Sequence, residues 1–144
     1  MRGWRSSRSG RATACSLADT IGVGVPAQVT ELTAAVREVS AAPLRAHFHN
    51  TRNTGYANAV TAAANGFAAL DASLGGIGGC PFAPAATGNI ATEDLAYLLN
   101  RSGLATGVAV APAAETGAWI GQQLGLDKVP AQLGRAGDFP GDRR

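Results

Sequence analysis

The strongest constraint on the fold is a strand–loop–helix pattern that occurs three times along the chain. Short apolar runs ending in polar residues alternate with longer segments whose apolar residues recur at helical spacing. The expected strands cover residues 14–20, 43–49 and 68–74, and the expected helices cover residues 26–40, 54–67 and 91–103. Strands joined by helices through short connections are parallel, with right-handed crossovers. The sequence therefore predicts an α/β fold.

Local signals mark the ends of these helices. Pro26 suits the first turn of the first helix. Asn65 and Gly66 are expected to end the second helix. Thr92 is expected to cap the third helix, and Gly103 to end it. Three parallel strands leave both sheet edges unpaired, so this sheet is expected to need further partners.

The chain of 144 residues has the length of one domain. Residues 1–14 are arginine-rich and are expected to form a disordered leader, with an organellar transit peptide as the alternative. Residues 15–125 are expected to form the folded unit, including a fourth helix over 113–125. Residues 126–144 carry proline, glycine and charge, which predicts a loose tail.

Composition limits the classes of partner. Hydrophobic residues make up 46% of the chain and charged residues 15%, with a formal net charge of +2, which is typical of a globular protein. Nothing in this charge distribution indicates a nucleic-acid surface. No apolar run is long enough to cross a membrane. Two cysteines without a secretory segment indicate a reducing compartment, so we expect a cytoplasmic location.

Two histidines at the end of the second expected strand are candidate metal ligands. His47 and His49 are separated by one residue, so on a strand their side chains point to the same face. Parallel α/β folds build their sites at this end of the strands. The alternative is a pair of solvated strand histidines, because this spacing alone is common.

Polar residues also end the other two strands. Asp19 and Asp71 occupy these positions, and a role in a site or in helix capping and turns is equally open for them. Asp71 has the further alternative of facing a neighbouring strand. Cys15, within the first strand, suits an inert packing role.

The glycine-rich segment 73–89 carries Cys80. A thiol in such a loop is more accessible than one in a strand, and the glycines and prolines around it favour a lid that moves on a hinge. The motif GxxxxGK[ST] is missing, which argues against a phosphate loop. Asn89, at the end of the segment, either caps the following helix or offers an oxygen ligand, and the residues alone favour the cap.

Four segments together resemble a known family. They are "SLADTIGVGVP", "HFHNTRNTGYAN", "DASLGGIGGCPFAPAATGNIATEDLAYLL" and "SGLATGV". In this order and spacing they are similar to the C-terminal part of 3-hydroxy-3-methylglutaryl-CoA lyase, from about residue 15 to residue 125. The resemblance implies part of a TIM (β/α)₈ barrel, namely its last three βα units and C-terminal helices.

The resemblance also implies a site and a reaction. In the family a divalent cation, Mg²⁺ or Mn²⁺, is held by residues that match His47, His49 and Asn89. Cys80 matches the general acid of a retro-Claisen cleavage that yields acetyl-CoA and acetoacetate from an acyl-CoA substrate. Asp19 and Glu93 match residues with supporting roles.

Departures from the family pattern limit what is expected of the chain. Asn50 replaces a frequent aspartate, and Ala85 a frequent glycine. The first strand of the family's barrel, which carries a metal-binding aspartate and a substrate-binding arginine, has no counterpart. We therefore expect the chain alone to be inactive and to need a missing N-terminal barrel half or a second copy. The alternatives are a non-catalytic remnant and another metal-dependent aldolase or acyl-CoA condensing enzyme of the same superfamily.

Overall fold

The computed structural model describes residues 14–79 and 87–136. Three strands, β1 (Cys15–Asp19), β2 (Leu44–Phe48) and β3 (Ala69–Asp71), form one sheet in the order β1-β2-β3. Both neighbouring pairs are parallel. The prediction of an α/β fold with a parallel sheet is therefore confirmed.

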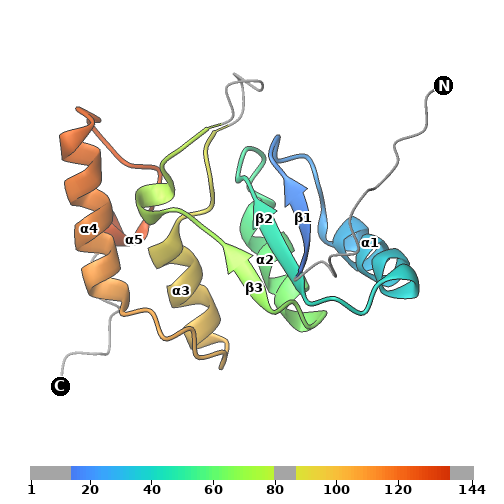
Figure 1. Ribbon diagram of the computed structural model, residues 1–144. Coiled ribbons are helices and arrows are strands. Elements are labelled where there is room, and N and C mark those ends of the chain that lie inside the picture. The colour runs from blue at the N-terminus through green and yellow to red at the C-terminus, as the bar shows by residue number, and fades with distance from the viewer. Residues whose placement is uncertain (1–13, 80–86, 137–144) are drawn as a thin grey trace.

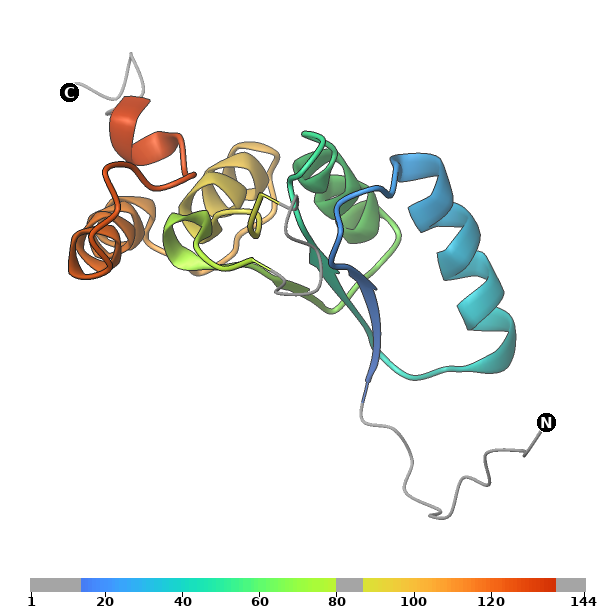
Figure 2. The ribbon, with the colours of Figure 1, turned by 90° about the horizontal axis from the view of Figure 1, so that it is seen from above.

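Helices connect the strands and continue the chain after them. They are α1 (Pro26–Val39), α2 (Gly55–Ala64), the short 3₁₀ helix η1 (Leu74–Gly76), α3 (Thr92–Arg101), α4 (Val110–Gln123) and α5 (Leu133–Ala136). Helices α1, α2 and α3 lie on one side of the sheet, and α4 lies beyond α3 (Figures 1 and 2). None of the described helices is long and apolar enough to cross a membrane.

The central strand β2 separates the core from an open face of the sheet. Leu44, Ala46 and Phe48 are buried against the helices, whereas Arg45 is exposed and His47 half-buried on the opposite face. This alternation follows from the two-residue period of a strand. The buried cluster around β2 includes residues of α1, α2 and α3. Its members are Val29, Ala46, Phe48, Ala59, Ala62, Ile90, Leu95 and Leu99.

Helix α4 packs on the glycine-rich turn that follows β3. Gly117 lies so close to this turn that a Cβ atom added there would be 2.7 Å from the backbone nitrogen of Gly75. The turn itself needs glycine, because Gly75 and Gly76 have φ angles of 69° and 66°. The segment leading towards Cys80 is therefore held between α3 and α4 at its start.

Some helix ends differ from the prediction. Thr92 is the first residue of α3 and Ala91 is the N-cap, without a side-chain cap bond, so the prediction that Thr92 caps this helix is wrong. Ala91 takes this position because it has the extended backbone of an N-cap residue, with φ −80° and ψ 138°, whereas Thr92 is already helical. The predicted end of α2 is confirmed, since Asn65 is its C-cap and Gly66 has a φ of 75°.

Residues 126–136, which the sequence places in a loose tail, contain α5 and are attached to the fold. Ala131 is 2% exposed, and its backbone nitrogen donates to the carbonyl of Gly75 at 3.0 Å. Asp94 accepts hydrogen bonds from the backbone nitrogens of Gln132 and Leu133, each at 2.8 Å. Sequence reasoning missed these contacts because they join residues far apart in the chain.

Candidate functional site

The two histidines lie together at the C-terminal end of β2. His47 is in the strand, and His49 follows one residue after the strand ends. Their ring centroids are 5.0 Å apart with an interplanar angle of 70°. His49 is 3% exposed, and its backbone nitrogen donates to the carbonyl of Asp19 at 3.1 Å. The two imidazole rings are therefore neighbours at this end of the sheet.

Asn89 lies directly beside His49. The two residues form an isolated antiparallel bridge. On either side of this bridge, the backbone nitrogen of Asn50 donates to Gly88 and that of Ile90 donates to Phe48, at 3.2 and 3.3 Å. Residues directly opposite each other in such a bridge have their side chains on the same side. The chain that returns from the cysteine loop thus brings Asn89 to the histidine pair.

The side chain of Asn89 is fixed by the other end of the same loop. Its Nδ2 donates to the carbonyls of Ile77 at 3.0 Å and Gly78 at 3.3 Å. Asn89 therefore does not cap α3, contrary to the alternative that the residues alone favour. Because both amide hydrogens are directed to these carbonyls, the Oδ1 atom of Asn89 faces away from them as an acceptor.

Two buried acceptor atoms at this place have no hydrogen-bond partner among the described residues. They are Nδ1 of His49 and Oδ1 of Asn89. A buried polar atom without a partner is costly, and an ion is one of the explanations for it. Imidazole nitrogen and amide oxygen are donors that a divalent cation accepts. The residues present therefore fit a metal ion.

Electrostatics keep His49 in the form that binds metal. Burial lowers its pKa below the ordinary value of 6.5, and the neighbouring His47 lowers it further, while the charge of Asp19 acts in the opposite direction. Metal ligands must be deprotonated, so a neutral imidazole is ready to coordinate.

The described residues do not complete a metal site by themselves. Within residues 14–79 and 87–136, no group of three or more histidine, cysteine, aspartate and glutamate residues is placed to hold a metal ion. The candidate set therefore consists of two imidazoles and one amide oxygen. Its remaining ligands have to come from the substrate, from solvent or from another part of the protein.

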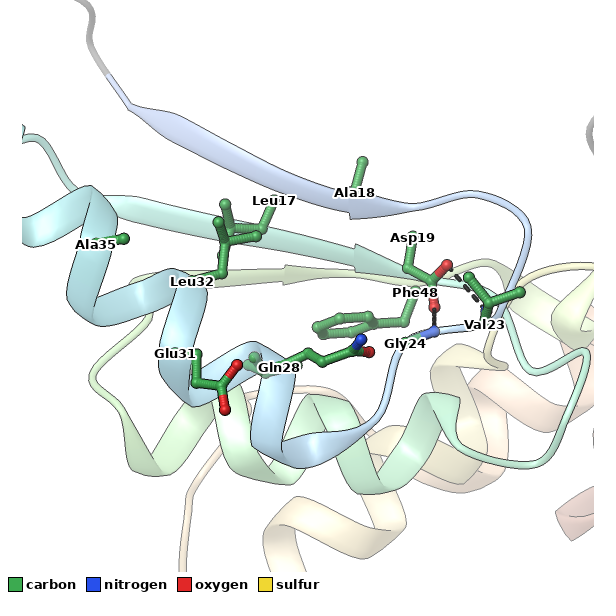
Figure 3. A pocket seen from close by; sticks show the side chains of 11 residues that line it. Leu17, Ala18, Asp19, Val23, Gly24, Gln28, Glu31, Leu32, Ala35 and Phe48 are labelled. Atoms are coloured by element: carbon green, nitrogen blue, oxygen red, sulfur yellow. Dashed lines mark hydrogen bonds between the residues drawn. The ribbon is translucent and has the colours of Figure 1, made fainter.

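Asp19 shapes the loop between β1 and α1. Its Oδ1 accepts a hydrogen bond from the backbone nitrogen of Val23 at 3.1 Å, and its Oδ2 accepts one from Gly24 at 2.8 Å (Figure 3). The carboxylate also lines an apolar cavity of about 540 Å³ between β1 and α1, with Leu32 and Phe48 among its walls (Figure 3). In this structure, Asp19 holds its own loop and acts on His49 through its charge.

Glu93 supports the turn from which the cysteine loop departs. Its side chain is buried at the start of α3, with 1% of the residue exposed. Both carboxylate oxygens accept hydrogen bonds from the backbone nitrogen of Gly75, at 3.0 and 3.1 Å. Burial raises the pKa of this carboxyl group. Cys80, the predicted general acid, lies outside the described residues.

Tyr56 is a site-supporting residue that the sequence did not indicate. Its hydroxyl donates to Asp94 at 3.2 Å and accepts a hydrogen bond from the backbone nitrogen of Ala91 at 2.9 Å. Tyr56 thereby anchors the segment that carries Asn89. No local motif marks this role, because both partners of Tyr56 are remote from it in the sequence.

The chain is similar in sequence to acyl-CoA lyases. A family model described as HMGL-like matches residues 6–120. The chain is 46% identical over 125 residues to hydroxymethylglutaryl-CoA lyase of Pseudomonas mevalonii, covering 85% of this chain and 40% of that protein. It is 48% identical over 122 residues to (R)-citramalyl-CoA lyase of Chloroflexus aurantiacus, covering 84% of this chain and 38% of that protein.

Solved structures agree with these relatives. An HMG-CoA lyase from Acinetobacter baumannii, in complex with coenzyme A and 3-methylmalate, matches with a TM-score of 0.80 and 40% identity over 88% of this chain and 41% of that one. The HMG-CoA lyase of Bacillus subtilis matches with a TM-score of 0.77 and 40% identity over 83% of this chain and 40% of that one. The chain thus spans about two fifths of the length of these relatives. It belongs to the HMGL-like family, whose relatives named above are lyases.

Proposed function

We propose that this chain provides the metal-binding and proton-donating part of a hydroxymethylglutaryl-CoA lyase, which cleaves 3-hydroxy-3-methylglutaryl-CoA into acetyl-CoA and acetoacetate. The observation that carries the proposal is the pair of buried atoms on His49 and Asn89, beside the ring of His47, that have no hydrogen-bond partner among the described residues. Residues 15–125 act as the last three βα units and C-terminal helices of a (β/α)₈ barrel.

His47, His49 and Asn89 hold the cation, Mg²⁺ or Mn²⁺, in this proposal. When bound, the cation supplies positive charge that lowers the pKa of the substrate hydroxyl and holds a substrate oxygen. The chain prepares for this in two ways. Asn89 is oriented by its hydrogen bonds to Ile77 and Gly78, and burial keeps His49 neutral. Little reorganisation is then needed when the substrate arrives.

Cys80 acts as the general acid. The tertiary hydroxyl loses its proton to a base, the carbon–carbon bond breaks, and its electron pair stays on the departing acetyl-CoA carbon. The thiol of Cys80 then donates its proton to that carbon, a role suited to a group with an ordinary pKa of about 8.5. Glu93 holds Gly75 at the start of the loop that carries this thiol. Asp19 shapes the neighbouring loop after β1.

A second piece of barrel completes the enzyme. The chain covers 38% to 41% of four related lyases, so more than half of each of these proteins has no counterpart in it. Among the described residues, β1 and β3 each pair only with β2, and an apolar cavity lies along β1. These free edges and this cavity suit the rest of the barrel as a partner. The isolated chain is therefore a poor catalyst in this proposal.

The second candidate function is cleavage of citramalyl-CoA. It is favoured by the 48% identity to the (R)-citramalyl-CoA lyase of Chloroflexus aurantiacus, which is similar to the identity with the hydroxymethylglutaryl-CoA lyases. Both candidates are acyl-CoA lyase reactions, and the same cation and thiol roles apply to each.

Complementation tests the proposal. The chain is expressed together with the N-terminal part of the Pseudomonas mevalonii enzyme, and both acyl-CoA substrates are offered with Mg²⁺. We expect acetoacetate from 3-hydroxy-3-methylglutaryl-CoA, its loss in Cys80→Ala, and its retention in the matched control Cys15→Ala at the start of β1. Turnover of citramalyl-CoA alone would support the second candidate. A complemented barrel that cleaves neither substrate would indicate a non-catalytic remnant.

A further inference from the structure

A charged pair, Arg45 and Asp71, lies on the same sheet face as His47. Arg45 precedes His47 by two residues on β2, so both side chains project from the open face. In the register of β2 and β3, Arg45 is opposite Ala69 and His47 is opposite Asp71. The carboxylate of Asp71 therefore starts from the position directly beside the first histidine.

The guanidinium of Arg45 reaches diagonally to this carboxylate. Its Nη2 is 2.5 Å from Oδ1 of Asp71, and the two side chains are 49% and 37% exposed. Diagonal neighbours on adjacent strands are within reach of long side chains. An exposed ion pair of this kind contributes little to stability. The function of the Arg45–Asp71 pair is therefore inferred from its position beside His47 and not from its contribution to stability.

Charges next to a ligand histidine act on the cation that the histidine binds. A carboxylate beside the histidine increases the attraction for a cation. A guanidinium near the same place repels the cation, and its ion pair with the carboxylate offsets the negative charge of that carboxylate. The two groups thus have effects of opposite sign on the same site.

We propose that the negative charge of Asp71 strengthens cation binding at His47, and that Arg45, by pairing with Asp71, limits this effect. The proposal rests on the metal site put forward under the proposed function. It concerns the affinity of that site, because neither residue is a proposed ligand.

The test measures Mn²⁺ binding to the whole 144-residue chain by electron paramagnetic resonance, in the wild type and in two single variants. Asp71→Asn, which keeps the shape of the side chain and removes its charge, is expected to weaken binding about 5-fold, because a negative charge near the cation is lost. Arg45→Met, which keeps most of the stem, is expected to tighten binding. Glu31→Gln is the matched control, because this carboxylate lies on α1 at the helix side of the sheet, and its affinity should equal that of the wild type.

Changes in Mn²⁺ affinity of opposite sign in the two variants distinguish the proposal from a purely structural role of the pair. If the pair only holds β2 to β3, both variants lower the melting temperature and both weaken binding, and the proposal is overturned. Unchanged affinity in Asp71→Asn also overturns it, while the metal site remains. If the wild-type chain binds no Mn²⁺, both the site and the role of the pair are refuted.

Discussion

Replacing Glu93 with alanine should destabilise the chain much more than replacing it with glutamine. The carboxylate is buried, and both of its oxygens accept from the backbone nitrogen of Gly75. Alanine leaves this nitrogen without its acceptor and creates a cavity between α3 and α4. Glutamine keeps one acceptor oxygen at the same distance from the backbone.

The magnitudes follow from these contacts. Loss of a hydrogen bond to a charged group, with a buried donor left unpaired, lowers the free energy of unfolding by about 2–3 kcal/mol. Glutamine loses the charge but keeps the neutral hydrogen bond, so its cost stays within about 1 kcal/mol. The expected difference between Glu93→Ala and Glu93→Gln is therefore about 1–3 kcal/mol.

The pH dependence has a definite sign. Burial raises the pKa of Glu93 above its ordinary value of 4.5, so the folded state holds this proton to a higher pH than the unfolded state. The stability of the wild type relative to Glu93→Gln is therefore greatest below pH 4.5. It falls as the pH rises through the raised pKa of the folded state, and it is constant above that pKa.

Urea unfolding of the wild type and both variants, from pH 4.5 to about neutral pH, measures these differences. Other titrating groups cancel because all comparisons are made at the same pH. Equal stability of Glu93→Ala and Glu93→Gln would refute the role of Glu93 as the acceptor for Gly75. A wild type that gains stability over Glu93→Gln with rising pH would refute the effect assigned to burial.

Three further changes have distinct expected results. Gly117→Ala places a Cβ atom 2.6 Å from Oε1 of Glu93, so we expect the free energy of unfolding, measured with urea, to fall by about 1–3 kcal/mol. The control Gly134→Ala, whose added Cβ atom has its nearest neighbour at 3.9 Å, should change this free energy little. Asn89→Ala should weaken Mn²⁺ binding by at least about 10-fold in a titration followed by electron paramagnetic resonance, whereas the control Gln122→Ala, at an exposed position, should not. Equal affinities of the wild type and Asn89→Ala would exclude Asn89 as a ligand. Burial lowers the pKa of His49, so as the pH falls the imidazole is protonated in the unfolded chain before it is protonated in the folded chain. In thermal melts, the wild type should therefore lose stability relative to His49→Gln as the pH falls below 6.5. A gain in stability there would contradict the effect assigned to burial.

Local patterns were sufficient to predict the framework of the fold. The alternation along β2 is a property of neighbouring residues, so the prediction that His47 and Phe48 lie on opposite faces of the strand is confirmed. The third strand was predicted too long. It ends at Asp71, because the Ser73 backbone nitrogen donates to Ile90 and the turn η1 begins at Leu74.

The candidate site depended on contacts that no local pattern contains. Asn89 could be assigned either as a cap or as a ligand from the residues alone, and the antiparallel bridge to His49 decides against the cap. The alternative that Asp71 faces a neighbouring strand agrees with its pairing to Arg45. The role of Cys80 stays a prediction, because it rests on resemblance and lies outside the described residues.

In the proposed site, His47, His49 and Asn89 bind one divalent cation. Pulsed electron paramagnetic resonance of Mn²⁺ added to the chain, compared with ¹⁵N-histidine-labelled chain, detects directly which nitrogens coordinate the ion. We expect couplings to two imidazole nitrogens in the wild type and to one in His49→Ala. A spectrum of hydrated Mn²⁺ without nitrogen coupling, identical in the two proteins, would exclude the two histidines as ligands.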